Sequence, residues 1–265
     1  MPEGPKCRAL TSYLEKQLKG HTLQKVQVVG GRYRRKEPEG LAEFRRKLPT
    51  KLTNIKSYGK DIWFQFDNGL FLLNHLGMEG WWTLGEEKPP YPVIHLSFDR
   101  KDLWFTDVRN FGKVKFCPLD CLLALLQSRG EDILAERMDA KRAVKLLRQH
   151  DRMKIADALL EQDSLSGVGN YLRAEILYAL RLYPFSLVRN LSDGTLGEIA
   201  KMARKLAKRN LKILERDSIL DEYRTILPFK VYGRDEDPYG NRVKKTKGKG
   251  GRTIHWVPEI QVKKS

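Results

Sequence analysis

Residues 159–177, LLEQDSLSGVGNYLRAEIL, decide the fold of the second half of this 265-residue chain. Apolar side chains recur at helical spacing on both sides of a glycine-containing turn. Gly167 and Gly169 let the backbone approach another surface closely, and Asn170 is suited to cap the helix that follows. Because the free amides at a helix start bind anions, we expect this segment to clamp a phosphate backbone while reading little base information. The alternative is that the glycines serve only the steric needs of a helix–helix turn.

Helical spacing continues on both sides of this stretch. It predicts helices over residues 119–128, 140–149, 152–162, 170–181 and 193–216. The last of these has a basic face, which is ordinary solvated surface in most helices: Lys201, Arg204, Lys205, Lys208, Arg209 and Lys212.

The first half of the chain has a different period. Residues 3–19 have apolar residues at helical spacing and end at a glycine, which predicts a helix. Residues 22–116 alternate instead, with one hairpin expected around the Asp-Asn-Gly turn at 67–69 and another over 93–106. The pattern predicts a β-sandwich.

The last forty residues form a third region. Residues 226–265 contain ten Lys/Arg and four Asp/Glu. Two short β-like runs, 229–232 and 252–257, flank a Gly/Lys-rich loop at 244–251, so we expect a hairpin with a basic tip. Four apolar and aromatic residues favour this anchored element over a disordered basic tail: Phe229, Tyr232, Ile254 and Trp256.

The overall charge of the chain needs an explanation. The chain has 50 Lys+Arg against 33 Asp+Glu, a formal net charge of +17, which indicates either a solubilising surface or a polyanionic partner. No apolar run reaches the roughly 18 residues of a membrane span, and the first residues lack the apolar core of a secretory signal. Three cysteines are too few for a disulfide framework. We therefore expect a soluble protein of a reducing compartment, and the charge alone does not choose between DNA, RNA and anionic lipid as the partner.

The first five residues, Met-Pro-Glu-Gly-Pro, can form a nucleophilic centre. Removal of Met1 would free the secondary amine of Pro2, which forms an obligatorily cationic iminium with a carbonyl-like carbon. That cation acidifies the neighbouring carbon and drives elimination, and Glu3 is placed to donate a proton. Pro and Glu are also ordinary residues at a helix start, which is the alternative.

Three further sites carry residues that suit DNA. Lys60, after a glycine, can meet a phosphate. Met78, in the loop His-Leu-Gly-Met-Glu-Gly, suits an apolar wedge between base steps, although methionine more commonly fills a core. Arg252 follows two glycines and could present its guanidinium to a phosphate or a leaving group; a solvated arginine is the alternative.

Taken together, these motifs are similar to those of the formamidopyrimidine-DNA glycosylase / endonuclease VIII family. The resemblance runs from Pro2 to about Gln261, and the spellings PEGP and GNYLRAEIL are nearer to the endonuclease VIII branch. It implies an α+β fold of three parts. These are an N-terminal helix and two-layer β-sandwich catalytic domain (1–117), a helical domain with a helix-two-turn-helix motif (118–225), and a β-hairpin finger with a basic tail (226–265).

The resemblance implies a bifunctional enzyme of base excision repair. Pro2 would attack C1′ of the damaged nucleotide, and Glu3 would protonate the opening sugar or the leaving group. Lys60 would bind phosphate and assist β-elimination, and Arg252 would assist δ-elimination. The damaged base must first be flipped out of the stack.

The resemblance also implies DNA-binding roles. Asn170 would hold the backbone near the lesion, and Met78 would enter the gap left by the flipped base. Arg109, in the segment Thr-Asp-Val-Arg-Asn-Phe-Gly, would face the orphaned base or the backbone. Phe111 would be a second gap-filler or a core residue. Glu175 matches a family carboxylate near the site whose role stays open.

The tail departs from the family pattern, because most relatives have a four-cysteine zinc finger here and this chain has no cysteine after Cys121. The tail therefore resembles a zincless finger held by side-chain packing, with no metal and no cofactor. Four residues stand roughly where ligands would be expected: Tyr239, Val243, Val257 and Ile260.

Lys6 is a second departure, since relatives commonly have Glu there. A cation near the Pro2 amine would favour the neutral, nucleophilic form of that amine.

The resemblance implies that the partner is DNA with oxidised bases or abasic sites, bound by a monomer, with no membrane partner. It also implies an intracellular location, in the nucleus or another DNA-containing compartment. Oxidised pyrimidines are the favoured lesions, with ring-opened purines or hydantoins as additions. Two alternatives are a catalytically silent relative that binds damaged DNA, and an RNA- or ribosome-associated protein. The second gives no reason for the Pro-Glu start.

Overall fold

A computed structural model describes residues 2–216 and 227–263. Within this part the chain forms two compact units. The first contains Pro2 and Lys6–Gln127, and the second contains Glu3–Pro5, Ser128–Arg216 and residues 227–263. The three-part division expected at 117/118 and 225/226 stays a prediction, and Met1 lies outside the described residues.

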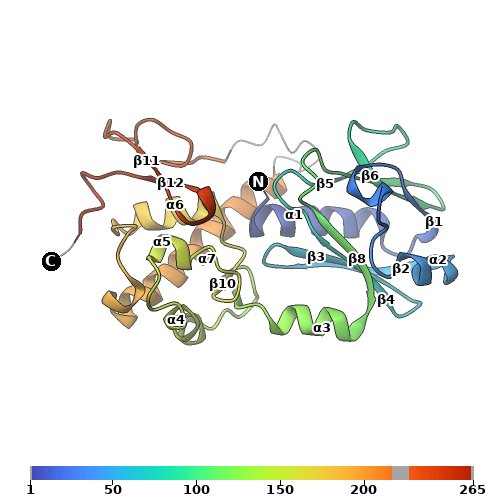
Figure 1. The fold of residues 1–265 in the computed structure, drawn as a ribbon, viewed down its shortest axis with the longest axis horizontal. Coiled ribbons are helices and arrows are strands. Elements are labelled where there is room, and N and C mark those ends of the chain that lie inside the picture. The colour runs from blue at the N-terminus through green and yellow to red at the C-terminus, as the bar shows by residue number, and fades with distance from the viewer. Residues whose placement is uncertain (1, 217–226, 264–265) are drawn as a thin grey trace. The chain divides into compact units, whose positions relative to one another are not determined.

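The first unit contains an antiparallel sheet of eight strands in the order β5-β7-β6-β1-β2-β3-β4-β8 (Figure 1). Helix α1 (Gly4–Leu18) starts among residues of the second unit and continues into the first. The further elements are β1 (Thr22–Val28), the 3-10 helix η1 (Gly31–Arg34), α2 (Leu41–Arg46), β2 (Thr50–Tyr58), β3 (Asp61–Phe66), β4 (Leu70–His75), β5 (Trp81–Leu84), β6 (Pro92–Phe98), β7 (Asp102–Thr106), β8 (Lys113–Pro118) and α3 (Leu119–Gln127).

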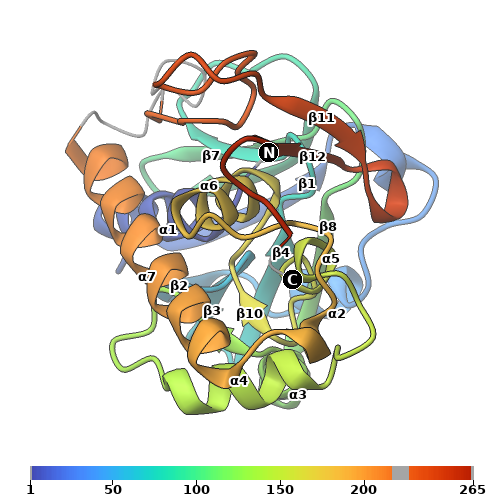
Figure 2. The same ribbon diagram turned by 90° about the vertical axis from the view of Figure 1, so that its left-hand side faces the viewer.

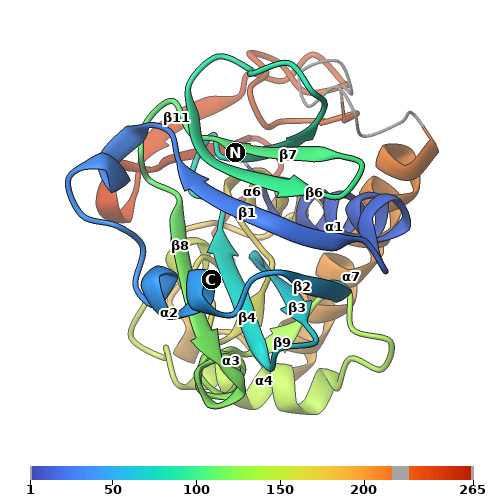
Figure 3. The same ribbon diagram turned by 90° about the vertical axis from the view of Figure 1, so that its right-hand side faces the viewer.

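This single sheet folds over into two layers, as the alternating pattern predicts (Figure 3). Four strands separate β3 from β5 in the sheet order, which would place them roughly 24 Å apart in a flat sheet. The ring centroids of Phe64 on β3 and Trp82 on β5 nevertheless lie 5.1 Å apart. The indole of Trp82 also donates to Asn74 Oδ1 at 2.9 Å, so its one polar atom is satisfied in the core. Truncation of Trp82 to alanine would cost about 3–5 kcal/mol of unfolding free energy.

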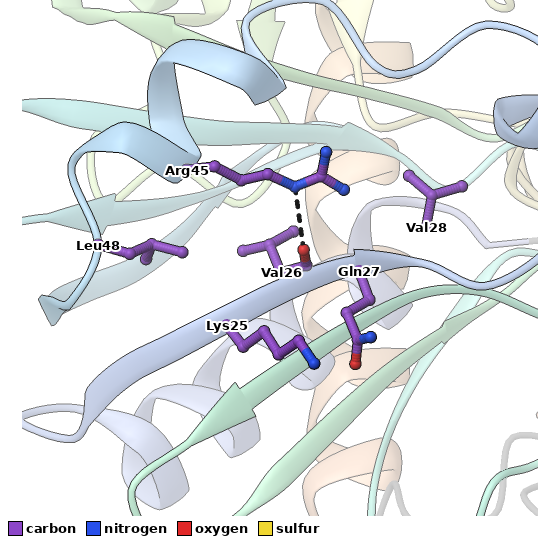
Figure 4. A pocket seen from close by; sticks show the side chains of 6 residues that line it. All are labelled: Lys25, Val26, Gln27, Val28, Arg45 and Leu48. Atoms are coloured by element: carbon purple, nitrogen blue, oxygen red, sulfur yellow. Dashed lines mark hydrogen bonds between the residues drawn. The ribbon is translucent and has the colours of Figure 1, made fainter.

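The two layers of the sheet diverge where the pairing between β1 and β2 ends. These two strands pair only through Thr22 and Leu23, so the rest of β1 has an uncovered edge on that side. Arg45 from α2 donates from Nε to the Val26 carbonyl at 3.2 Å and so satisfies one exposed main-chain acceptor (Figure 4). A hollow of about 360 Å³ lies beside this contact.

The second unit is built around a buried central helix, α6 (Asn170–Ala179) (Figure 2). Every residue of α6 from Asn170 to Tyr178 is buried, so the helix has no solvent face. The other elements are β9 (Glu131–Asp132), α4 (Ala140–Arg148), α5 (Ile155–Ala158), β10 (Leu165–Ser166), η2 (Val188–Asn190), α7 (Asp193–Arg216), β11 (Lys244–Lys247), η3 (Lys249–Gly251) and β12 (Thr253–Trp256). The expected helix over 152–162 is wrong in length, because only Ile155–Ala158 is helical.

The tail hairpin is present, but its first strand differs from the expectation. β11 pairs with β12 in register, from Lys244 opposite Trp256 to Lys247 opposite Thr253. The run at 229–232, which was expected to be a strand, is not one. Residues 244–247 of the expected loop form the first strand instead. The sequence of β11, Lys-Lys-Thr-Lys, has no apolar residue, so no alternation marks it and its pairing with β12 defines it.

Apolar packing holds the hairpin region against α6. Val231, Val243 and Val257 form a buried cluster with two α6 side chains, and Ile260 packs against it. Three of the four expected positions, Val243, Val257 and Ile260, thus pack here, whereas Tyr239 is 77% exposed. Across residues 2–216 and 227–263, no helix has both the length and the apolarity that a bilayer crossing requires.

Candidate active site

The carboxylate of Glu3 binds the amino end of α6. Its two oxygens accept from the backbone amides of Gly169 (2.8 Å), Tyr171 (2.8 Å) and Leu172 (3.2 Å), and the residue is 0% exposed. A helix start offers unpaired N–H donors and a positive dipole end, so it stabilises a negative charge there. The second unit therefore fixes the carboxylate that follows Pro2 in the sequence.

Glycines make this contact possible. Gly169 has an ordinary extended backbone, but a Cβ there would lie 2.6 Å from Cγ of Glu3, inside the van der Waals limit. The Gly4 amide donates to the Gly167 carbonyl at 2.9 Å, and a Cβ on Gly4 would meet Gly167 Cα at 3.1 Å. The glycines of the turn serve close approach, as expected, and the surface that approaches is residues 3–4.

This geometry corrects two expectations for the turn. The amides expected to bind a DNA phosphate bind Glu3 instead. Asn170 does not cap α6, because Gly169 holds the N-cap position and no side chain of the turn caps the helix. The Glu3 carboxylate has taken the donors that an Asn cap would use.

Asn170 instead accepts from Arg173. The Arg173 Nη2 donates to Asn170 Oδ1 and, at 2.9 Å, to the Thr253 carbonyl, while Nη1 donates to the Ala156 carbonyl at 3.2 Å. Burial lowers the pKa of Arg173 to about 10, an effect that Asp157 opposes and Arg252 reinforces. Asn170, a predicted DNA-binding residue, is therefore held by a buried arginine that the sequence patterns did not single out.

Arg252 and Glu175 belong to the same unit. Arg252 is exposed at the end of the hairpin tip, directly before Thr253, which Arg173 holds. Glu175 is buried on α6, and its carboxylate accepts from the amides of Lys230, Val231 and Tyr232, each at 2.9 Å. Glu175 thus anchors the segment that leads into the hairpin.

Lys60 lies in the first unit at the turn between β2 and β3. Gly59 before it has a left-handed φ of +56°, which a side chain rarely adopts. The Lys60 carbonyl accepts from the thiol of Cys7 on α1 at 3.7 Å. The backbone of Lys60 is therefore tied to the helix that Pro2 precedes.

Two exposed loops of the first unit, residues 76–80 and 107–112, lie against each other and are called here the paired loops. A Cβ on Gly77 would lie 2.7 Å from atoms of Phe111 and Gly112, so the two backbones touch. Arg109 forms an ion pair with Glu79, with 3.2 Å between Nε and Oε1, and its Nη1 donates to the sulfur of Met78 at 3.7 Å. The fold thus brings together the three expected residues of these loops, and all are exposed: Met78 38%, Arg109 50% and Phe111 55%.

Asp107 organises the second of the paired loops. Its carboxylate accepts from the Gly112 amide at 2.6 Å, and burial raises the pKa of Asp107 against the pull of backbone amides. Asn110 adopts a left-handed φ of +57° and accepts from the Arg32 amide at 3.0 Å. The sequence shows only that Asp107 precedes Gly112 by five residues. This spacing does not indicate that the carboxylate of Asp107 is buried.

Polar contacts also brace the finger. Asp237 accepts from the Tyr178 hydroxyl at 2.9 Å and from the amides of Tyr239 and Asn241 at 2.9 Å. Hydrogen bonds keep the pKa of Asp237 below its usual value although burial opposes them. Within the described residues, no three His, Cys, Asp or Glu side chains gather as a metal ion would require.

Comparison with known proteins gives matches along the chain. Residues 1–114 match the formamidopyrimidine-DNA glycosylase N-terminal domain, and residues 130–219 match the formamidopyrimidine-DNA glycosylase H2TH domain. A formamidopyrimidine-DNA glycosylase of Acidothermus cellulolyticus is 30% identical over 219 residues, covering 80% of this chain and 77% of the relative. Endonuclease 8 of Escherichia coli is 25% identical over 272 residues, covering 98% of this chain and all of the relative.

Solved structures are similar as well. The crystal structure of an inhibited Fpg from Lactococcus lactis in complex with N7-benzyl-Fapy-dG containing DNA matches with a TM-score of 0.87 at 25% identity. The match covers 99% of this chain and 100% of that one. Relatives with both names match at similar identity, so the assignment to the endonuclease VIII branch stays a prediction.

Proposed function

Because this chain belongs to the formamidopyrimidine-DNA glycosylase family, whose members are DNA glycosylases with AP lyase activity, we propose that it excises oxidised bases through a Schiff base on Pro2. It then nicks the strand by β,δ-elimination. The observation that carries this proposal is the fixed carboxylate of Glu3, one residue from the proposed nucleophile and bound by three amides.

The first steps use Pro2 and Glu3. With Met1 removed, the neutral amine of Pro2 attacks C1′, the glycosidic bond breaks, and the base leaves with a proton. The C1′–O4′ bond then opens, O4′ takes a proton, and the nitrogen becomes an iminium. Glu3 transfers these protons and, when ionised, stabilises the cation beside it.

Elimination follows from the iminium. It acidifies the C2′ proton, whose loss expels the 3′ phosphate with Lys60 as a phosphate ligand. A second proton loss expels the 5′ phosphate, assisted by the guanidinium of Arg252. Asn170 holds the backbone next to the lesion, and Glu175 acts by anchoring the segment that leads to the hairpin.

The paired loops replace the flipped base. Met78 and Phe111 are exposed apolar side chains that can fill the gap, and Arg109 can contact the orphaned base or the backbone. Oxidised pyrimidines are the preferred substrates in this proposal, with ring-opened purines and hydantoins as further ones. The enzyme acts as a monomer.

Borohydride trapping on a duplex with one oxidised pyrimidine tests this proposal. We expect a covalent protein–DNA adduct that is lost in Pro2→Gly and in protein that retains Met1. The exposed Glu198, which pairs with Lys201 on the surface, provides the matched control. Glu198→Gln should form the adduct as fast as wild type. In Glu3→Gln the rate of adduct formation should fall about 100-fold or more.

Lesion-specific binding without an adduct would indicate the catalytically silent relative and would exclude the enzyme.

A further inference from the structure

Arg173 is a buried cation to which the proposed reaction assigns no task. It is 1% exposed and lies one helical turn after Asn170. Its fork of donors joins three segments, since it contacts Asn170 on α6, the Ala156 carbonyl on α5 and the Thr253 carbonyl on β12. The planar guanidinium can bridge such acceptors at fixed angles, which an ammonium group cannot.

The contact with Thr253 fixes the backbone beside Arg252. On the other side of Arg252, the Lys249 amide donates to Asp157 Oδ1 at 3.3 Å and the Lys249 ammonium pairs with Glu161 at 2.9 Å. The hairpin tip is thus attached to the helical body both before and after Arg252. The exposed guanidinium of Arg252 projects from a backbone held at both sides.

The charge of Arg173 is only partly balanced. The nearest carboxylate that pairs with it is Asp157, at 4.0 Å, and this same oxygen also accepts from the Lys249 amide. Arg252 adds a second positive charge to this neighbourhood, and the carboxylate of Glu3 partly offsets it. Neutral acceptors make most of its close contacts, and a buried charge without a close counter-charge is costly. The hydrogen bonds that join α5, α6 and β12 also fix Asn170 relative to the backbone beside Arg252.

We propose that Arg173 is a positioning residue for strand cleavage, which sets Asn170 and Arg252 in register so that both engage the same stretch of DNA backbone. The inference rests on the proposed function, in which Asn170 holds that backbone and Arg252 assists δ-elimination. Arg173 joins the two through the Asn170 side chain and the Thr253 carbonyl.

The test is the ratio of δ- to β-elimination products on a duplex with one preformed abasic site, with enzyme in excess. The ratio counts only strands that folded enzyme has cut, so a partly unfolded variant does not mimic the effect. We expect Arg252→Gln to lower the ratio about tenfold, and both Arg173→Gln and Arg173→Lys to lower it several-fold. The double variant R173Q/R252Q should fall no further than R252Q, because both changes act through one group.

Arg204 provides the control, since it too donates to two backbone carbonyls, those of Ala135 (2.5 Å) and Glu136 (2.8 Å), within the same unit. Arg204→Gln should keep the wild-type ratio.

A wild-type ratio in Arg173→Lys, or additive losses in the double variant, would overturn the inference while leaving the proposed function intact. If R173Q cuts no DNA, the product ratio of R173K alone tests the inference. If R252Q itself keeps the wild-type ratio while borohydride trapping persists, the role of Arg252 fails and the inference fails with it.

Discussion

The amino end of α6 and the paired loops hold their functional side chains in opposite ways. At α6, Glu3 and Asn170 are buried, and each accepts from donors of the helix. In the paired loops, Met78 and Phe111 are exposed, whereas the backbones of the two loops pack against each other. Chemistry needs a fixed group, whereas filling a gap in DNA needs an apolar side chain that faces solvent until DNA arrives.

This comparison predicts that a single methyl group at α6 has the largest effect. In Gly169→Ala the new Cβ would displace Glu3, and the rate of base excision should fall about 100-fold or more. Gly197→Ala is the matched control, because its nearest neighbour is 4.0 Å away and alanine favours the interior of α7. Single-turnover kinetics measure both. Equal activity of the two variants would contradict the view that Glu3 is held in place for the reaction.

A methyl group in the paired loops should weaken binding more than chemistry. Gly77→Ala would press on Phe111 and Gly112 and should weaken lesion-duplex binding about tenfold. Gly69→Ala isolates the backbone strain, since Gly69 has a similar left-handed φ of +79° but no neighbour within 4 Å. Titration by fluorescence anisotropy compares the two. A larger loss in the Gly69 variant would argue against loop packing as the cause.

The tail should respond to pH through His255. Burial lowers the pKa of His255, and the nearby charges of Lys245 and Arg173 act in the same direction. A base whose folded pKa is lowered contributes stability above its unfolded pKa of about 6.5, and this stability is lost as the pH falls below that value. The protection factors of the β11–β12 amides, which are corrected for the pH dependence of intrinsic exchange, should therefore fall in wild type between about pH 7.5 and about pH 5.5. In His255→Phe they should fall less. The same pH dependence in both proteins would rule His255 out.

The smallest expected effect is that of a chelator. Because Val231, Val243 and Val257 pack against α6 and Asp237 accepts from Tyr178 of the same helix, side-chain packing holds the finger in place. Excision activity should not change after prolonged incubation with EDTA. Loss of activity that zinc restores would overturn the metal-free finger.

Much of the fold could be predicted from periodicity. The expected helices over 3–19, 170–181 and 193–216 correspond to α1, α6 and α7, and the hairpin around 67–69 corresponds to β3 and β4. Local spacing reports α1 and α7 because each has an apolar face, and it reports α6 because apolar residues recur along this buried helix. It failed for β11, whose strand depends on a partner, and for 152–162, where only one turn is α-helical.

The site could be predicted only in part, because its contacts join distant residues. Glu3 could be named from the first five residues, but its binding to amides some 166 positions later has no local signal. Arg173 lies inside the segment 159–177, yet its hydrogen-bond partners Ala156 and Thr253 come from other parts of the chain. The role of Asp107 also could not be predicted, since only its burial in the fold distinguishes it from a surface aspartate.

The most direct test of the central claim is to locate the covalent bond. Borohydride-trapped adduct on an oxidised-pyrimidine duplex would be digested with nuclease and protease, and the modified peptide sequenced by mass spectrometry. The account predicts a reduced sugar remnant on the amine of Pro2, at the start of a chain that lacks Met1. A remnant on a lysine side chain, such as Lys6 or Lys60, would contradict it.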